Sequence, residues 1–314
     1  MAVYVNTNVS SLNGRRYLNN VQNQLTTTYQ RLSSGLRINS AKDDAAGLQI
    51  SSRLTTQING LNQGNRNASD GIAFAQTAEG AMDEMTSMLQ KMRTLAVQAN
   101  NGTNTGDDRK ALSKEATALA QEITRIAKQT KFGGSLILDG AGTNSIMTKG
   151  GGNAQGQNGK DEIGKLTLQV GANKGDSISF EVHAMKFSQI ASAGNIQKAD
   201  LEKFWKKGAN NAPDTISLTK TENIEAAITG LTTMIAAVDA SRAGLGAIQN
   251  RLESSIRNQA NVSANQSDAR SRIRDADFAE ESANLSQQSI IQQAATSMLM
   301  QANTRPQLGL SLLG

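Results

Sequence analysis

Residues 8–35 have the sequence NVSSLNGRRYLNNVQNQLTTTYQRLSSG, and this stretch determines how the rest of the chain must be arranged. Its apolar side chains recur in steps of three, four and seven, which places them in one narrow stripe along a helix. The positions off the stripe carry mostly Asn, Gln, Thr, Ser and Arg. The stripe consists of Val9, Leu12, Leu18, Val21, Leu25, Tyr29 and Leu32.

A second stripe lies at the other end of the chain, where Phe278 begins a similar pattern. Neither helix can bury its apolar face alone, so we expect the two ends to pair with each other and then with further copies of the chain. We call the positions on which this pairing depends the seam residues. They are Val9, Leu12, Leu18, Val21, Leu25, Leu32, Leu285, Ile291, Ala295, Met298, Leu299 and Ala302.

The composition of the 314 residues favours a thin helical bundle over an enzyme. Only 3% of the residues are aromatic and 38% are hydrophobic, so a core must be built from aliphatic side chains and Met. The absence of cysteine excludes disulfides and thiolate metal sites, and the single His183 argues against a histidine metal cluster or a catalytic triad. No catalytic residue, cofactor or metal is therefore expected.

Charge and hydropathy exclude two further classes of protein. The net charge is +5, but the basic residues are scattered among acids, so no nucleic-acid patch is expected. No apolar stretch reaches the length of a membrane span, so no membrane insertion is expected. The segment Met1–Val5 lacks a basic region followed by an apolar one, so we expect no Sec-type signal, and the default location on this ground is the cytoplasm.

The middle of the chain predicts a long helix followed by a shorter antiparallel one. The long helix should start at Ser40, a capping residue, and keep its apolar period to Ala99. Gly64, Gly71 and Gly80 mark either a bend or a break in it. After a turn at residues 101–106, a third helix should open at Asp107 and end at residues 132–134.

The segment after Gly134 predicts a small β insertion and then more helix. Residues 165–170 and 177–182 alternate as strands do and flank turn residues, which indicates a hairpin. Residues 184–218 are expected to be irregular, and residues 144–157 to contribute nothing to the core. A further long helix should start at the capping pair Thr219 and Glu222, break at the polar residues 263–267, and give way to a last helix over 275–302.

These elements predict a mainly α fold, an elongated coiled-coil-like helical bundle with a small β-hairpin insertion and paired N- and C-terminal helices. We expect three parts. Residues 1–39 and 275–314 form an inner core of terminal helices. Residues 40–143 and 221–274 form an outer helical core, and residues 144–220 a short variable insertion.

Several long motifs resemble bacterial flagellin, the subunit of the flagellar filament. They include residues 6–12, 32–47, 95–99, 252–253, 269–273 and 275–278, and the tail from 301 to 313, so that the resemblance covers about 1–138 and 222–314. The hairpin residues 166–173 are similar too. The resemblance implies a structural protein without catalytic activity that forms a homopolymeric helical filament for swimming or swarming.

The same resemblance implies a location and several partners. Flagellins leave the cell unfolded through the flagellar type III export apparatus without a cleaved signal, so the product is extracellular, which reverses the cytoplasmic default. Implied partners are an export chaperone at the C-terminal helix and the filament cap and hook-junction proteins. The central region, about residues 144–220, is short for the family.

A host flagellin-sensing Toll-like receptor is a further partner that the resemblance implies. The positions that match the family's receptor-binding patch are Gln90, Lys91, Leu95, Gln98 and Glu115. Residues 91, 95 and 98 are neighbours on one helical face. Lys91 stands where the family commonly has arginine, and Thr94 where it commonly has an acid, so recognition is expected to be weakened.

Three other kinds of protein share some of these features. The hook–filament junction protein of the flagellum has similar ends, but the Asn6–Val9 opening and the full-length signatures favour flagellin. A flagellin with a zinc-protease insert needs His-Glu-x-x-His, which one histidine cannot supply. A basic coiled-coil protein that binds nucleic acid would need a Lys/Arg stripe with interleaved aromatic residues.

Overall fold

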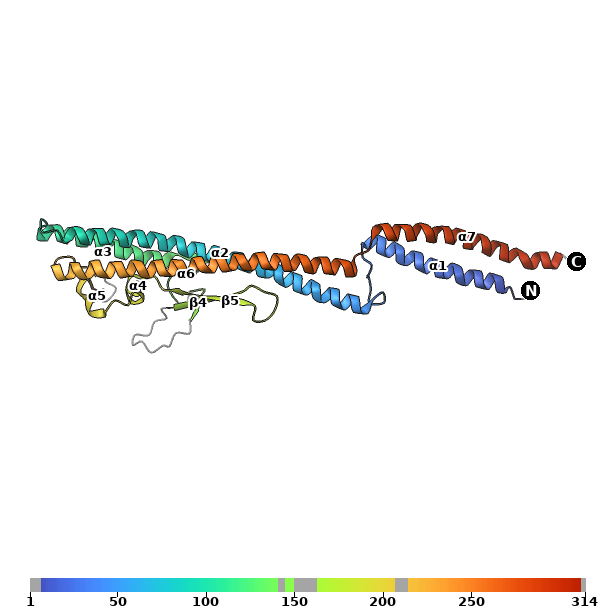
Figure 1. The fold of residues 1–314 in the computed structure, drawn as a ribbon, viewed down its shortest axis with the longest axis horizontal. Helices are drawn as coiled ribbons and strands as arrows, with labels where there is room; N and C mark the ends of the chain where they lie inside the picture. The colour runs from blue at the N-terminus through green and yellow to red at the C-terminus, as the bar shows by residue number, and fades with distance from the viewer. Residues whose placement is uncertain (1–6, 141–144, 150–162, 207–213, 312–314) are drawn as a thin grey trace. The chain divides into compact units, whose positions relative to one another are not determined.

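The protein is described by a computed structural model over residues 7–140, 145–149, 163–206 and 214–311 (Figure 1). The described part is mainly helical, as the sequence predicts. The helices are α1 (Val9–Ser34), α2 (Ala45–Ala99), α3 (Gly106–Gln129), α4 (Phe187–Ala193), α5 (Lys198–Phe204), α6 (Thr221–Arg274) and α7 (Phe278–Ser311). The strands are β1 (Lys131–Phe132), β2 (Ser135–Leu136), β3 (Thr148–Lys149), β4 (Ile163–Gln169), β5 (Ser177–His183), β6 (Trp205–Lys206) and β7 (Thr215–Ile216).

The chain divides into two compact units. The terminal unit comprises Met1–Asn59 and Val262–Gly314, and the central unit comprises Gly60–Asn261. Both divisions fall inside a helix, the first in α2 and the second in α6. The three-part division expected from the sequence remains a prediction.

In the terminal unit, α1 and α7 pair side by side and antiparallel, which confirms the predicted pairing of the chain ends (Figure 1). α1 begins where the Asn8 side chain accepts a hydrogen bond from the Ser11 amide, and it ends at Gly35, which is left-handed at φ 71°. Val21 and Leu25 are each only 4% exposed between the two helices. The Asn8 side-chain amide also donates to the Ala302 carbonyl over 2.7 Å, which ties the two outer ends together.

The start of α2 differs from the expectation. The helix begins at Ala45 rather than at Ser40, because Asp44 is the residue that caps it, accepting from the Gly47 amide over 2.9 Å. Asp43 instead closes a turn by accepting from the amides of Asn39 and Ser40. Two consecutive acids could each cap a helix, and the second of them does so.

The expected break at residues 263–267 is absent, because α6 continues to Arg274. Ser, Asn and Gln lower helix propensity only slightly, and the stretch contains neither Gly nor Pro. The expected end of the last helix at residue 302 is also wrong, since α7 extends to Ser311. At the start of α6, the Thr219 hydroxyl shares a hydrogen bond with Ser217, and the helix begins at Thr221, one residue later than a cap at Thr219 implies.

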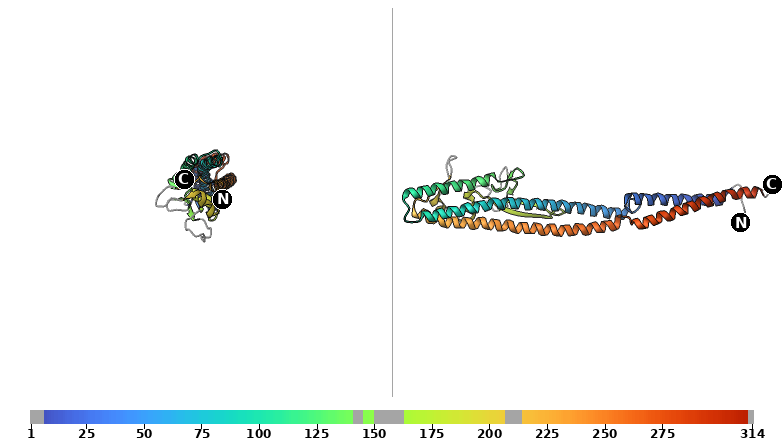
Figure 2. Two further views of the ribbon diagram at one scale, coloured as in Figure 1. Left: turned by 90° about the vertical axis from the view of Figure 1, so that its left-hand side faces the viewer. Right: turned by 90° about the horizontal axis from the view of Figure 1, so that it is seen from above.

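The core of the central unit lies between α2, α3 and α6, with the β hairpin packed against it (Figure 2). α2 and α6 are linked antiparallel by the Asp83–Arg242 ion pair at 2.9 Å and by the hydrogen bond from Arg93 to Thr232. Aliphatic and Met side chains fill most of this core, as the low aromatic content requires. Its large and fully buried members include Phe74, Met82, Met85, Leu89, Met92, Ile123, Ile137 and Leu138.

The predicted hairpin is confirmed as β4 and β5, which pair antiparallel with Leu166 opposite Phe180. β3 adds a third strand beside β4. α2 continues unbroken through its glycines. Two of these glycines allow the hairpin to approach the helix closely. A Cβ atom on Gly64 would lie 2.0 Å from the Val170 carbonyl oxygen, and one on Gly71 would lie 2.2 Å from a Leu168 methyl carbon.

Replacing Gly64 by Ala should therefore destabilise the protein. The β4–β5 turn would have to move, at a cost of about 1–3 kcal/mol, which exceeds the gain of up to about 1 kcal/mol in helix propensity. Gly80→Ala is the matched control, because nothing lies within 4 Å of its added Cβ, and it should stabilise. Urea unfolding of both variants is the measurement, and stabilisation by Gly64→Ala would contradict the close contact.

The sequence predicts an irregular segment over residues 184–218, and this prediction is wrong. The segment contains α4, α5 and the β6–β7 pair. It contributes Phe187 and Phe204, both fully buried, to the main core, and the Trp205 ring lies 6.2 Å from that of Phe187. Helices of seven residues are too short for their periodicity to be recognised. Met147 is also buried, with 4% of its surface exposed, so the expectation that residues 144–157 add nothing to the core is wrong there. Residues 144 and 150–157 lie outside the described part.

Among the described residues, one helix, α6, is long and apolar enough to cross a membrane by length and composition alone. Its residues Ile224, Met234 and Val238 are fully buried in the central unit. A core helix passes the same test, so this feature does not assign a membrane span.

Candidate assembly interface and recognition patch

The seam residues are only partly covered within one chain. Val21 and Leu25 are buried, but Val9 is 56% exposed, Leu12 54% and Met298 70%. The inner positions of the stripe therefore pair α1 with α7, and the outer positions keep large apolar surfaces in contact with solvent. The other seam residues, Leu18, Leu32, Leu285, Ile291, Ala295, Leu299 and Ala302, are half-buried.

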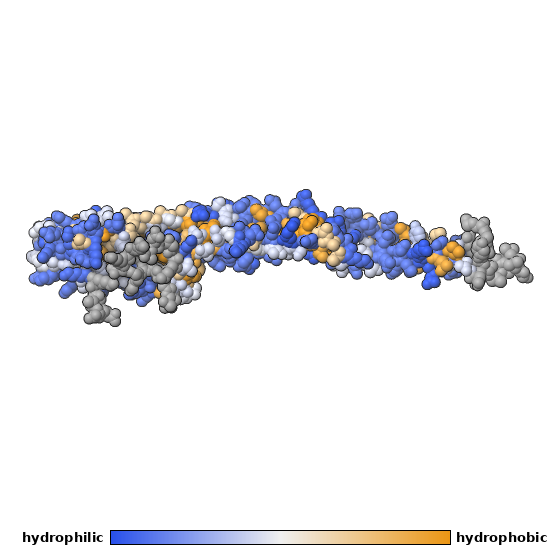
Figure 3. Space-filling model, turned by 90° about the horizontal axis from the view of Figure 1, so that it is seen from below, coloured by the Kyte–Doolittle hydropathy of each residue, from blue (hydrophilic) through white to orange (hydrophobic). Residues whose placement is uncertain are grey.

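Other exposed apolar side chains on the same two helices lie off the predicted stripe and were missed. Tyr17 is 68% exposed, Ile290 67% and Met300 64%. Between the helices lies a groove of about 670 Å³, which is lined by Ser10, Asn13, Gly14, Tyr17, Ala295, Met298, Gln301 and Ala302. Figure 3 shows small apolar patches on a largely hydrophilic surface. The signal in the sequence that could have identified Tyr17, Ile290 and Met300 is the presence of large apolar residues on otherwise polar helices.

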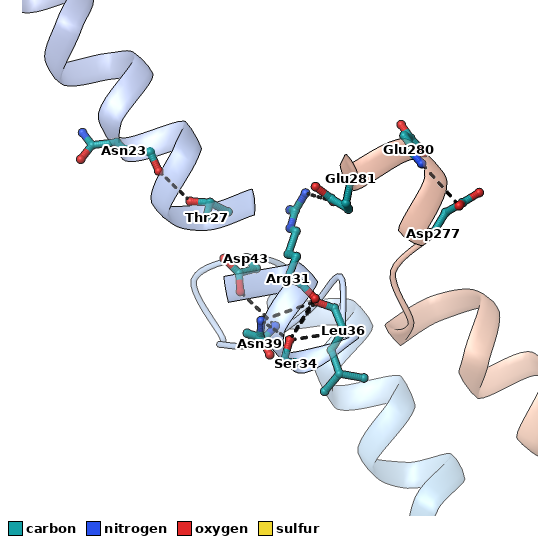
Figure 4. Close-up of polar contacts among 10 residues, drawn as sticks. All are labelled: Asn23, Thr27, Arg31, Ser34, Leu36, Asn39, Asp43, Asp277, Glu280 and Glu281. Carbon is teal, nitrogen blue, oxygen red and sulfur yellow. Dashed lines mark hydrogen bonds and ion pairs between the residues drawn. The ribbon is translucent and has the colours of Figure 1, made fainter. Parts of the chain in front are cut away.

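An ion pair fixes the inner end of the α1–α7 pair (Figure 4). Arg31 from α1 points toward Glu281 from α7, with 3.0 Å between Nη1 and Oε1, and the Glu281 side chain is 9% exposed. A buried carboxylate needs such a partner, so the pair fixes which residues of the two helices face each other.

The chain segments next to this ion pair are joined by main-chain hydrogen bonds. The Arg37 amide donates to the Arg274 carbonyl over 2.7 Å, and the Ala276 amide donates to the Gly35 carbonyl over 3.0 Å. Hydrogen bonds from the Ser40 and Asn39 amides lower the pKa of the Asp43 carboxyl below its ordinary value, with a smaller contribution from the Arg31 charge. Asp43 therefore holds its turn as a carboxylate.

The positions expected to form a receptor patch come together from α2 and α3. Lys91 and Glu115 form an ion pair of 3.0 Å, and their side chains are 59% and 46% exposed. Gln90 and Gln98 are exposed on α2, whereas Leu95 is only 7% exposed and belongs to the core cluster. The surface of the patch is therefore polar, and Leu95 lies beneath it.

Within the described ranges, no group of three or more His, Cys, Asp or Glu side chains could hold a metal ion. Paired chain ends, exposed apolar stripes and a polar surface instead define a helical structural protein.

Comparison with known proteins identifies the family of this chain. Residues 5–143 match the bacterial flagellin N-terminal helical region, and residues 226–313 match the bacterial flagellin C-terminal helical region. The chain therefore belongs to the bacterial flagellin family. It is a structural subunit of the extracellular flagellar filament, which serves bacterial motility.

Relatives match along the whole chain. Flagellin A of Vibrio anguillarum is 40% identical over 378 aligned positions, and polar flagellin C of Vibrio parahaemolyticus is 38% identical over 383, each alignment covering 100% of both chains. Both alignments are longer than the 314 residues here, so these relatives contain segments that this chain lacks. A solved structure assigned as a flagellar hook-associated protein of Vibrio parahaemolyticus has a TM-score of 0.54 at 16% identity, covering 74% of this chain and 100% of that one, which shows the fold alone.

Proposed function

We propose that the subunits polymerise through a seam formed by α1 and α7, in which neighbouring copies cover the apolar faces that one chain leaves exposed. The supporting observation is that Val9, Leu12 and Met298 are more than half exposed although they belong to the apolar stripes. Removing apolar surface from water contributes about 25 cal/mol per Å². A head-to-tail contact that does not close generates an open helical polymer.

Substituting Leu25 by Asp tests this proposal. Leu25 is 4% exposed, so the change places an unpaired carboxylate inside the seam, and we expect no filaments in polymerising salt. Leu299→Asp should act in the same way from the α7 side. Leu25→Met, which keeps the volume and the apolar character, is the matched control and should polymerise normally. Normal filaments from Leu25→Asp, seen by electron microscopy, would refute the seam.

The second proposed role is recognition of the monomer by the host flagellin-sensing Toll-like receptor. The Lys91–Glu115 pair brings the matching positions of α2 and α3 to one exposed surface, flanked by Gln90 and Gln98. Because Lys91 lacks the planar fork of arginine, we expect binding to be weaker than an arginine there would give.

Glu115→Ala should lower the potency of the monomer in a receptor-reporter assay by about five- to thirtyfold, the effect of losing 1–2 kcal/mol of binding. Lys114→Ala removes an exposed charge from the next position of α3 and is the control. Leu95→Ala is a further variant, with circular dichroism to show that its core is intact. If wild type signals and the variants signal equally well, the patch assignment is wrong; if wild type is silent, Lys91 and Thr94 abolish recognition.

The remaining partners follow from family membership. We propose export by the flagellar type III apparatus without a cleaved signal, an export chaperone on α7, and contacts with the filament cap and hook-junction proteins. A hook–filament junction role is the alternative to a filament role. Full-length identity of 35–40% to eight flagellins favours the filament.

A further inference from the structure

The turn between α2 and α3 contains the dipeptide Asn101–Gly102, and both residues are exposed. In the described part of the chain, no hydrogen bond uses the Gly102 amide or the Asn101 side chain. A Cβ atom added to Gly102 would meet nothing within 4 Å. The backbone amide and the neighbouring carboxamide are thus both free to react with each other.

The same dipeptide occurs at Asn13–Gly14 and Asn59–Gly60, in different surroundings. Both lie inside helices, α1 and α2, where the glycine amide takes part in the helical hydrogen bonding. Both glycines are also closely packed. A Cβ atom added to Gly14 would lie 3.1 Å from Leu299, and one added to Gly60 would lie 2.7 Å from Ala172. A fourth copy, residues 158–159, lies outside the described part.

We propose that Asn101 is a site of spontaneous deamidation. The fold makes Asn101 react faster than the Asn-Gly dipeptides that lie inside helices. The Gly102 nitrogen loses its proton to hydroxide and attacks Cγ of Asn101. The new C–N bond closes a five-membered imide, and the side-chain nitrogen leaves as ammonia. Water then opens either carbonyl of the imide, which yields aspartate or isoaspartate, so the net change is uptake of one water and release of one ammonia.

The product changes the turn in two ways. A carboxylate at position 101 adds negative charge beside the C-terminal end of α2, where the helix dipole is already negative. Isoaspartate routes the main chain through Cβ and Cγ of residue 101, which adds a methylene after the amide that donates to Gln98. The original Asn101 carbonyl, which accepts from Asn104, becomes a carboxylate outside the main chain. The reaction therefore loosens the connection between α2 and α3.

Peptide mapping by mass spectrometry, with isoaspartyl methyltransferase labelling, tests the proposal on the full-length monomer. At mildly alkaline pH we expect Asn101 to convert at least about tenfold faster than Asn13 or Asn59, because the helical sites must first open locally. In concentrated urea the three rates should converge. Gly102→Ala, checked for its fold by circular dichroism, should slow conversion at Asn101.

Three outcomes would overturn the proposal. Asn101 could remain unmodified in the native protein, Asn13 or Asn59 could convert as fast as Asn101, or the Gly102→Ala variant could convert at the wild-type rate. A fourth contradicting outcome is a rate difference that persists in urea, because it would show that local sequence, not the fold, selects the site.

Discussion

Deletion of Met1–Ser33 should abolish filament formation and leave the central unit folded. The deletion removes α1 almost entirely, and with it the partner of the α7 stripe. The described core clusters of the central unit lie between Ala68 and Ile256, so neither cluster loses a side chain to this deletion. Circular dichroism should show a cooperative thermal transition, while electron microscopy in polymerising salt should show no filaments.

Two further deletions complete this experiment. Removing Ala283–Gly314, most of α7, should have the same effect from the other end of the chain. Removing residues 150–157, which are rich in Gly, Asn and Gln, should leave assembly intact, and this deletion spares the buried Met147. Filaments from either terminal deletion would contradict the seam, and failure of the 150–157 deletion would assign a structural role to that segment.

The largest effect on stability is expected from Phe74→Ala. Phe74 is 1% exposed, and its ring packs against Phe132 at 5.7 Å and Phe180 at 5.8 Å, so it joins α2 to β1 and to the hairpin. Truncating such a ring costs about 3–5 kcal/mol through lost burial and the cavity left behind.

Val97→Ala is the matched control for Phe74→Ala, because Val97 lies on the same helix and is 50% exposed. Its effect should stay within about 0.5 kcal/mol. Urea unfolding measures both. If the two variants unfold at the same urea concentration, the aromatic contacts do not hold the hairpin to the helices.

The sequence predicted those elements whose signals are local and uncontested. The stripe in residues 8–35 predicts a helix there, and Asn8 and Gly35 cap the two ends of α1. The hairpin followed from strict alternation on both sides of a turn. The pairing of the chain ends followed from two narrow stripes that could not be buried separately.

The errors arose where the outcome depends on competition or on tertiary contacts. Ser40 and Asp44 can both cap a helix, and only the fold shows that Asp44 does. α4 and α5 are too short to show a period. The approach of Val170 to Gly64 depends on a hairpin that is more than a hundred residues away in the chain, so the glycine was mistaken for a weak point.

The candidate surfaces were only partly predictable for a similar reason. The seam residues could be placed on a stripe, but which of them remain exposed depends on how α1 and α7 are paired by Arg31 and Glu281. The burial of the Leu95 side chain could not be inferred from the spacing of residues along α2, because it depends on the packing of the neighbouring helix.

Cryo-electron microscopy of the full-length chain in polymerising salt tests the central claim most directly. We expect helical filaments in which Val9, Leu12 and Met298, all more than half exposed in the single chain, are buried against neighbouring copies. Filaments in which these three side chains remain exposed to solvent, or a monomer that does not assemble, would contradict the seam between α1 and α7.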